Sequence, residues 1–196
     1  MTLSQLRAAV RRDLRDEDPV DYRWSDDELD RHIDHALREF SQAIPLETEA
    51  TLPTVEGSRE VDLSSLTGLV MVESVEYPLD QSPPEYRRFE VWGNTLTLLD
   101  GDLPDGSDCG IRYGGLHTLD DVDSSIPARF EDLVAAGAEG HALMAWGAFT
   151  ANRISLGGEE TSATFVAQGQ QRLDHFRSQL RAHSHRNRMI IRRFYT

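Results

Sequence analysis

The sequence predicts an α+β, mainly α protein: an antiparallel helical bundle with an inserted small antiparallel β module and an extended C-terminal tail. Three observations predict it. Apolar residues recur at helical spacing towards both ends of the chain, short strand-like runs fill the middle, and arginines alternate with apolar residues at the end. With 196 residues, 39% of them hydrophobic, the chain can bury a core. We expect an N-terminal helix pair (1–45), a β-rich insertion (46–122), a C-terminal helix pair (123–183) and an arginine-rich docking tail (184–196).

The first helix is expected at about residues 3–16. Thr2 and Gln5 have the spacing of a capping box, in which each side chain accepts a hydrogen bond from the backbone amide of the other residue. Pro19 lies in the break that follows the helix. The apolar residues at helical spacing are Leu3, Leu6, Val10 and Leu14.

The second helix has the clearest beginning in the chain. Ser25 is the expected N-cap and Glu28 its capping-box partner, while Trp24 and Leu29 have the spacing of a hydrophobic staple. Pro45 is expected to end the helix because proline has no amide hydrogen and clashes with the preceding turn. The apolar stripe expected to face the core is Leu29, Ile33, Ala36, Leu37, Phe40 and Ile44.

Glu28, His32, His35 and Glu39 fall together on another face of this helix. Carboxylates and imidazoles at this spacing could bind a metal if a second helix supplied matching ligands. His141 is the nearest candidate, but Glu139 lies only two residues before it and therefore points to another side of the helix. We predict a solvated or subunit-facing polar stripe, with no catalytic residue, metal site or cofactor.

The β module is expected from five strand-like runs, and Gly93-Asn94 between two of them is a two-residue hairpin signal. Cys109, the only cysteine, excludes an internal disulfide and is interpreted as strand or core filler. The expected strands are residues 59–63, 69–77, 88–92, 95–99 and 109–113.

The third helix is expected to begin at a Ser124 or Ser125 cap, with Pro127 in its first turn and His117 in the polar loop before it. Its many small residues predict close approach of neighbouring backbones, because each glycine costs about 1 kcal/mol in a helix interior. A last helix from about Glu159 to His183 carries a coiled-coil-like seam. The seam residues are Val166, Gly169, Leu173, Phe176 and Leu180.

The charge is −14 overall but is unevenly distributed. No acidic residue follows Asp174, so the end of the chain carries about +6 and the rest about −20. An acidic body argues against ordinary DNA binding. The apolar residues of the tail favour docking into a protein groove over a disordered solubilising segment or a nucleic-acid arm. The docking residues are Arg186, Arg188, Met189, Ile190, Ile191, Arg192, Arg193, Phe194 and Tyr195.

Several stretches in this order resemble the head-to-tail adaptor (connector or head-completion) proteins of tailed double-stranded DNA phages. They are WSDDELDRHIDHALREF, VESVEYP, RRFEVWGNTLTLL and YGGLHTLDD followed by SSIP. The resemblance extends from about Leu3 to Leu180. It implies a non-enzymatic virion protein that forms a homo-oligomeric ring, usually of twelve subunits, below the portal protein in the phage neck.

Such a ring would extend the DNA channel, let genomic DNA pass without sequence-specific binding, and offer a platform to a stopper or tail-completion protein. The resemblance also assigns portal docking to the tail. The protein would be made in the host cytoplasm, since the chain shows no signal peptide or membrane segment. The alternatives are another neck or tail-completion protein, a metal-dependent enzyme using the Glu28–Glu39 face, and a packaging regulator.

Overall fold

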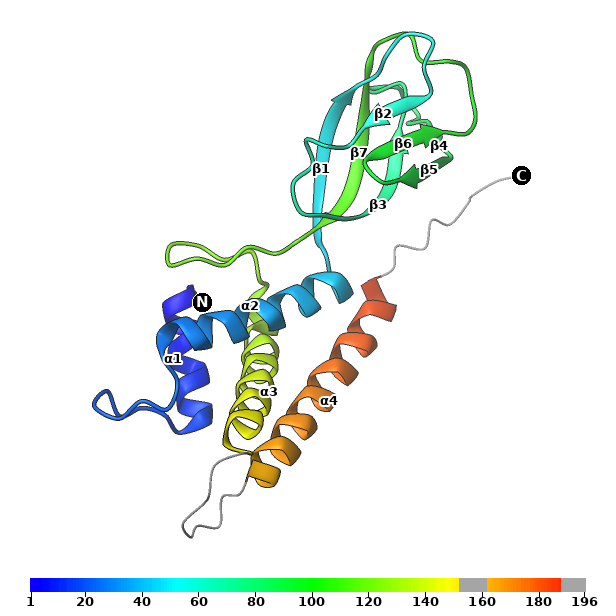
Figure 1. Ribbon diagram of the computed structural model, residues 1–196. Coiled ribbons are helices and arrows are strands. Elements are labelled where there is room, and N and C mark those ends of the chain that lie inside the picture. The colour runs from blue at the N-terminus through cyan, green and yellow to red at the C-terminus, as the bar shows by residue number, and fades with distance from the viewer. Residues whose placement is uncertain (152–161, 188–196) are drawn as a thin grey trace. The chain divides into compact units, whose positions relative to one another are not determined.

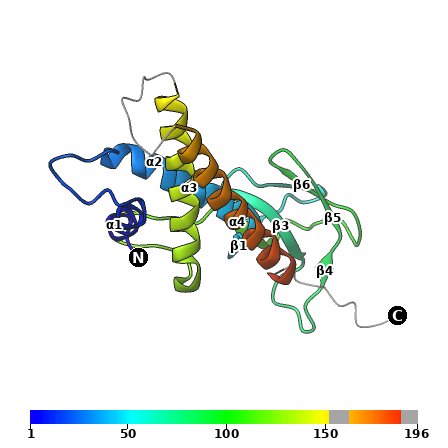
Figure 2. The same cartoon turned by 90° about the horizontal axis from the view of Figure 1, so that it is seen from below.

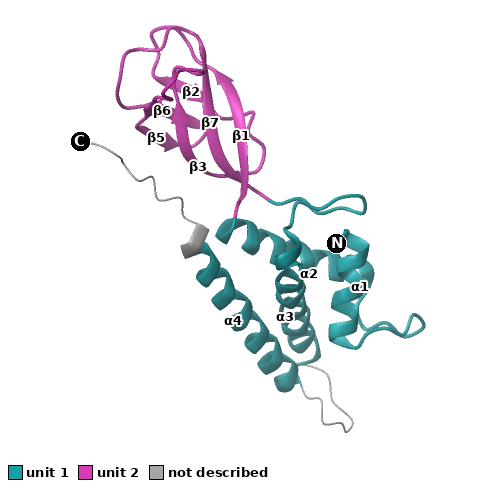
Figure 3. Cartoon of the chain, turned by 180° about the vertical axis from the view of Figure 1, so that it is seen from behind, with its two compact units in different colours: residues 1–44, 117–196 teal, residues 45–116 magenta. Residues whose placement is uncertain are grey.

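The computed structural model describes residues 1–151 and 162–187, which form two compact units (Figures 1 and 3). Unit 1 combines residues 1–44 with residues 117–196, and unit 2 consists of residues 45–116. The described part of the chain is a mixed α and β structure with four α-helices and antiparallel sheets. None of its helices has the length and apolar character needed to cross a membrane.

Unit 1 is helical. Helices α3 and α4 run side by side in both Figure 1 and Figure 2, and α2 packs against α3. Its core contains residues of every helix, and Phe40 and Phe176 are the largest side chains that are fully buried. The helices are α1 (Leu3–Leu14), α2 (Asp26–Ala43), α3 (Glu131–Thr150) and α4 (Ser162–Asn187), with a short 3₁₀ helix, η1 (Ala128–Phe130).

The predicted starts of α1 and α2 are confirmed. Both are capping boxes: the Thr2 hydroxyl accepts from the Gln5 amide, and the Ser25 hydroxyl accepts from the Glu28 amide. Helix α2 ends at Ala43, just before Pro45. Its predicted core stripe is buried, with exposures of 8% or less, as is Trp24. The stripe residues are Leu29, Ile33, Ala36, Leu37, Phe40 and Ile44.

The predicted serine cap of α3 is wrong. The helix begins at Glu131 after η1, and neither segment has a side-chain cap. The serine hydroxyls are used in the preceding turn instead: Ser125 Oγ accepts from the Thr118 amide at 2.8 Å, and Ser124 Oγ accepts from the Ile126 amide at 3.2 Å. Serine readily makes such local turn bonds, which compete with capping.

The predicted close approach of backbones occurs between α3 and α4. Gly169 of α4 is buried, and a Cβ at this position would lie 2.9 Å from the Met144 amide nitrogen and 3.0 Å from the Gly140 carbonyl oxygen. Both neighbours are backbone atoms, so a side chain could be accommodated only if the two helices moved apart. The glycine therefore sets the α3–α4 distance.

Gly169→Ala is expected to lower the free energy of unfolding of unit 1 by about 1–3 kcal/mol. Overpacking costs about this much, although alanine favours the helix by about 1 kcal/mol. Urea unfolding followed by far-ultraviolet circular dichroism measures the change. Gln168→Ala, at the exposed neighbouring position, is the matched control. A Gly169→Ala variant as stable as this control would contradict the assigned contact.

Helix α4 corrects the predicted boundary between helix and tail. It continues to Asn187, so residues 184–187, expected to be extended, are helical. No proline or glycine interrupts them, and the Ser184 hydroxyl donates to the Arg181 carbonyl at 2.9 Å. The predicted seam also shifts: Val166 is 37% exposed, whereas its neighbour Phe165 is buried. The predicted helix start at 159–161 lies outside the described residues.

Unit 2 contains two antiparallel sheets, with strand orders β1-β7-β3-β4 and β2-β6-β5. An apolar core that includes Leu96, Leu98 and Ile111 fills the unit. The strands are β1 (Leu46–Pro53), β2 (Glu60–Asp62), β3 (Leu69–Glu76), β4 (Tyr86–Arg87), β5 (Phe89–Trp92), β6 (Thr95–Leu98) and β7 (Asp108–Gly115).

The five predicted strands are confirmed with shifts of one or two residues at their ends. Trp92 pairs with Thr95 across the predicted Gly93-Asn94 turn. Cys109 is fully buried in the core of unit 2, which raises the pKa of its thiol. Strands β1 and β4 were not predicted. In β1, glutamates and threonines lie between the few inward-facing apolar residues, so its alternation is weak.

Candidate functional site

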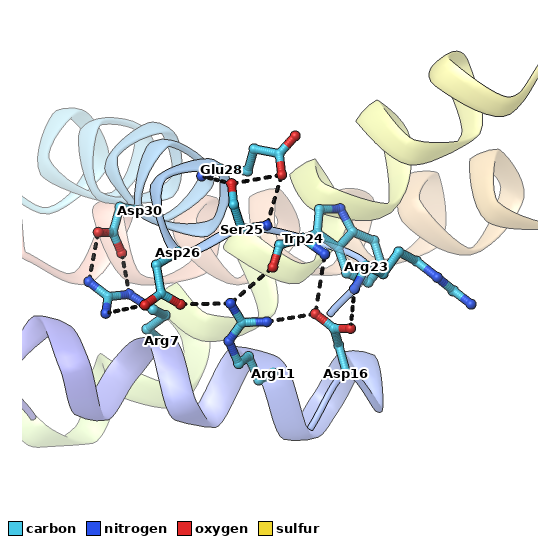
Figure 4. Close-up of polar contacts among 9 residues, drawn as sticks. All are labelled: Arg7, Arg11, Asp16, Arg23, Trp24, Ser25, Asp26, Glu28 and Asp30. Carbon is cyan, nitrogen blue, oxygen red and sulfur yellow. Dashed lines mark hydrogen bonds and ion pairs between the residues drawn. The ribbon is translucent and has the colours of Figure 1, made fainter. Parts of the chain in front are cut away.

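The predicted capping residues of α2 lie at a polar network that joins α1 to α2 (Figure 4). Arg11, 6% exposed, is at its centre and donates to the Asp16 carboxylate at 2.7 Å, the Asp26 carboxylate at 2.7 Å and the Trp24 carbonyl at 2.9 Å. Asp16 is also buried and accepts from the Arg23 backbone amide at 2.7 Å. The network therefore fixes the α1–α2 connection.

A second arginine extends this network along α1. Arg7 donates to both carboxylate oxygens of Asp30 at 2.7 Å and to Asp26 at 3.3 Å. The hydrogen bond with Asp30 raises the pKa of Arg7, and the one from Arg11 lowers the pKa of Asp26. Asp26 and Asp30 of α2 thus pair with α1, while Glu28 caps its own helix.

The histidine face of α2 is not the wholly polar stripe that was predicted. His32 is only 4% exposed, and its Nδ1 has no hydrogen-bond partner within the described chain. Burial lowers the pKa of His32 to about 4, with smaller contributions from nearby cationic groups. Glu28 is engaged at the helix cap, and His35 is exposed. The correction has a simple cause: His32 precedes the core residue Ile33 and lies on the border of the buried stripe.

Glu39 connects three helices. Its carboxylate accepts from Arg177 of α4 at 2.8 and 3.0 Å and lies 2.9 Å from His141 Nε2 of α3. The Arg177 hydrogen bond is the main reason that the pKa of Glu39 is lowered, while burial lowers the pKa of His141. His141, the nearest candidate on another helix, does lie against this face. Glu139 indeed lies elsewhere, pairing with Arg172 at 3.2 Å.

These groups do not make a metal site. Across residues 1–151 and 162–187, no three or more His, Cys, Asp or Glu side chains are grouped closely enough to hold a metal ion. The four residues of the Glu28–Glu39 face have separate surroundings: Glu28 caps α2, His32 is buried, His35 is exposed, and Glu39 pairs with α4. The arrangement stabilises helix packing.

His117 has a structural role that the sequence pattern did not reveal. It is 7% exposed, and its Nε2 lies 3.0 Å from the carbonyl oxygen of Ile44, the residue after α2. Burial lowers its pKa, which favours the neutral ring. The other ring nitrogen, Nδ1, lies 3.0 Å from both the carbonyl oxygen and the hydroxyl oxygen of Ser125. His117 thus closes the C-terminal end of α2.

A shallow hollow of about 310 Å³ lies where α4 meets the end of α2. Its lining combines the Glu39–Arg177 pair with Leu180, Arg181 and Ser184 of α4 and with Gln42 and Ala43 of α2. One of its lining residues, Ser184, is also the first residue of the predicted docking tail. Of the predicted docking residues, only Arg186 lies within α4; Arg188, Met189, Ile190, Ile191, Arg192, Arg193, Phe194 and Tyr195 lie outside the described residues.

The chain matches the model of the SU10 adaptor protein family over residues 1–190, and it therefore belongs to this family. Comparison with curated proteins gave no match. The resemblance to phage head–tail adaptors is confirmed, and the chain is a structural adaptor protein of a phage virion.

Proposed function

We propose that this SU10 adaptor family member forms a homo-oligomeric ring of twelve subunits between portal and tail. The ring extends the DNA channel and carries the platform to which a stopper or tail-completion protein attaches. The observation that supports this proposal most directly is the family match over residues 1–190. The family consists of adaptors, and an adaptor in the neck must contact the head on one side and the tail on the other.

The charge of the chain suits a DNA conduit. The chain has 34 carboxylates and 20 arginines, with no lysine. A channel wall with excess cations would bind phosphates and hold the DNA, whereas a wall with net negative charge repels them and lets the duplex slide. Genomic DNA would therefore pass through the ring without sequence-specific binding.

The C-terminal tail is the proposed contact with the portal. Six arginines and no carboxylate follow Asp174, and residues 188–196 also include two isoleucines and two aromatic residues. Arginine pairs with carboxylates in a bidentate geometry, while aromatic and aliphatic side chains supply the apolar contacts typical of interface hot spots. Together these groups would anchor each subunit by charge and by burial.

Deletion of residues 188–196 is expected to abolish binding to purified portal rings while leaving the unfolding of the helices unchanged. The cut spares residues 184–187, since they belong to α4. Co-sedimentation with portal rings measures binding, and far-ultraviolet circular dichroism measures folding. Two full-length variants divide the contributions: Arg188, Arg192 and Arg193 changed to glutamate test charge, and Ile190, Ile191 and Phe194 changed to serine test burial. A truncated protein that still binds portal would exclude the tail as the anchor.

Electron cryomicroscopy of the mature particle tests the ring itself. The proposal requires twelve copies of this chain in direct contact with the portal. A ring of this chain separated from the portal by another protein would instead identify it as a stopper or tail-completion protein. Absence of the chain from mature particles would exclude both roles.

A further inference from the structure

Unit 2 has an open side between its two sheets, where two strand edges lack neighbours. Strand β4 covers β3 only at Val75 and Glu76, so residues 69–74 of β3 have no strand on that side within the described part of the chain. Strand β5 is an edge of the other sheet and pairs only with β6. An unpaired strand edge can bind another strand, because its row of backbone N–H and C=O groups is available for hydrogen bonds.

The backbone of β5 presents a defined set of free groups. Trp92 and Thr95 flank the two-residue turn, and the Leu99 amide donates to the Arg88 carbonyl at 2.8 Å. In an antiparallel pair, hydrogen-bonded residues alternate with residues whose backbone groups point outwards. Phe89 and Val91 therefore present their N–H and C=O groups to the open side, and no backbone hydrogen bond within the described chain reaches that edge.

A hollow of about 620 Å³ lies beside this edge. Its walls come from residues 69–72 of β3, the segment around Leu63 and Leu66, and Phe89 and Val91 of β5. Val91 is 38% exposed although it pairs with the fully buried Leu96. The apolar floor is thus incomplete at the edge, and apolar side chains on the inner face of an added strand would cover it.

The outer face of β5 favours cationic side chains on an added strand, whereas the inner face favours apolar ones. Side chains alternate along a strand, so Glu90 and Trp92 lie on the face turned away from the hollow; both are exposed, Trp92 by 85%. Arginine or lysine opposite them would form a cross-strand ion pair and a cation–π contact. Unit 2 as a whole favours the same sign, since it carries fourteen carboxylates and four arginines.

The four arginines of unit 2 are already engaged. Arg88 pairs with Asp100, Arg112 with Glu49, and Arg87 with Glu85. Arg59 donates to the carbonyl groups of Asp100 and Gly101. Glu73 of β3 and Glu90 of β5, on the two strands with open edges, form no ion pair with these four arginines, so a cationic partner is favoured by charge.

We propose that the open side of unit 2 accepts an extended segment of the tail-side partner protein, with apolar residues alternating with arginine or lysine, as an added strand along β5. Naming the tail-side protein as its source rests on the proposed function; the strand-accepting edge does not. The sequence of residues 188–196 fits this pattern less well, because in an extended strand Arg193 would share a face with Met189 and Ile191.

The test uses the full-length protein and synthetic capped peptides. The probe is a seven-residue peptide of alternating arginine and valine, and its matched counterpart has glutamate at every arginine position. Calorimetry is expected to show binding of the arginine peptide at least about tenfold tighter than the glutamate peptide. Hydrogen exchange is expected to slow at the backbone amides of Phe89 and Val91 when the peptide binds. Binding through side chains alone would not protect these amides.

Variants then locate the site. Val91→Glu, which places a charge in the hollow, should abolish binding, whereas Leu103→Glu, at a 57% exposed position of unit 2 outside the hollow, should not. Glu90→Arg, on the exposed outer face, should shift the preference towards the glutamate peptide. Absence of binding, or protection away from β5, would overturn the strand site.

A third peptide tests whether the added strand comes from a partner protein or from a second copy of this chain. Residues 188–196 of this chain, supplied as a free peptide, should bind more weakly than the arginine–valine probe. Tighter binding of this peptide would assign the groove to a second copy of the chain and overturn the partner assignment. Protection at β5 by the probe, in a chain shown by imaging to form no ring, would refute the proposed function while leaving the strand-accepting edge in place.

Discussion

Arg11→Met is expected to lower the free energy of unfolding of unit 1 by about 3 kcal/mol. Arg11 and Asp16 are both 6% exposed, and their side chains are 2.7 Å apart. Removal of one partner of a buried ion pair leaves the other charge without compensation, which costs about 3–5 kcal/mol. Two backbone amides still bind Asp16, so the lower end of this range is expected.

The effect is measured by urea unfolding of the full chain, followed by far-ultraviolet circular dichroism. Arg12→Met is the matched control, because Arg12 is the exposed neighbour on the same helix and should change stability by less than about 0.5 kcal/mol. Adding Asp16→Asn to Arg11→Met removes the uncompensated carboxylate charge. The double variant should therefore recover part of the lost free energy of unfolding. If the double variant lost the full sum of the two single effects, the pair would not be coupled.

The local starts of α1 and α2 were predictable because capping depends on a few neighbouring residues. Thr2 with Gln5, and Ser25 with Glu28, make the capping boxes that their spacing indicates. The same reasoning failed at Ser125, whose hydroxyl bonds to Thr118, a residue in the turn before it. A serine can bond forwards or backwards along the chain, and local spacing alone does not decide between these geometries.

The polar contacts between helices could not be predicted from spacing. His141 meets Glu39 across 102 residues, and Arg177 reaches the same carboxylate from α4. Helical periodicity states which residues share a face, but not which faces meet or how each helix is rotated. The prediction of a solvated or subunit-facing polar stripe therefore missed that His32 is buried within its own chain.

The buried His32 ring should make unit 1 sensitive to acid. In the folded chain burial lowers the pKa of His32 from 6.5 to about 4, so the unfolded chain binds more protons between these two pH values. The stabilising contribution of the neutral ring is complete above the unfolded pKa and is lost as the pH falls towards 4. A pKa lowered from 6.5 to about 4 corresponds to a free-energy difference of about 3 kcal/mol.

His32→Leu should remove this contribution, because leucine does not titrate and leaves no imidazole nitrogen without a partner. Urea unfolding at about pH 7 and about pH 4 should show that the natural protein loses about 3 kcal/mol more than the variant over this interval. Other groups near this face, including Glu39 and His141, titrate in both proteins, so the difference isolates His32. His35→Leu, at the exposed position on the same helix, should retain the acid sensitivity of the natural protein. Equal acid losses in the His32→Leu and natural proteins would mean that His32 takes up its proton without cost, and hence that its ring reaches solvent.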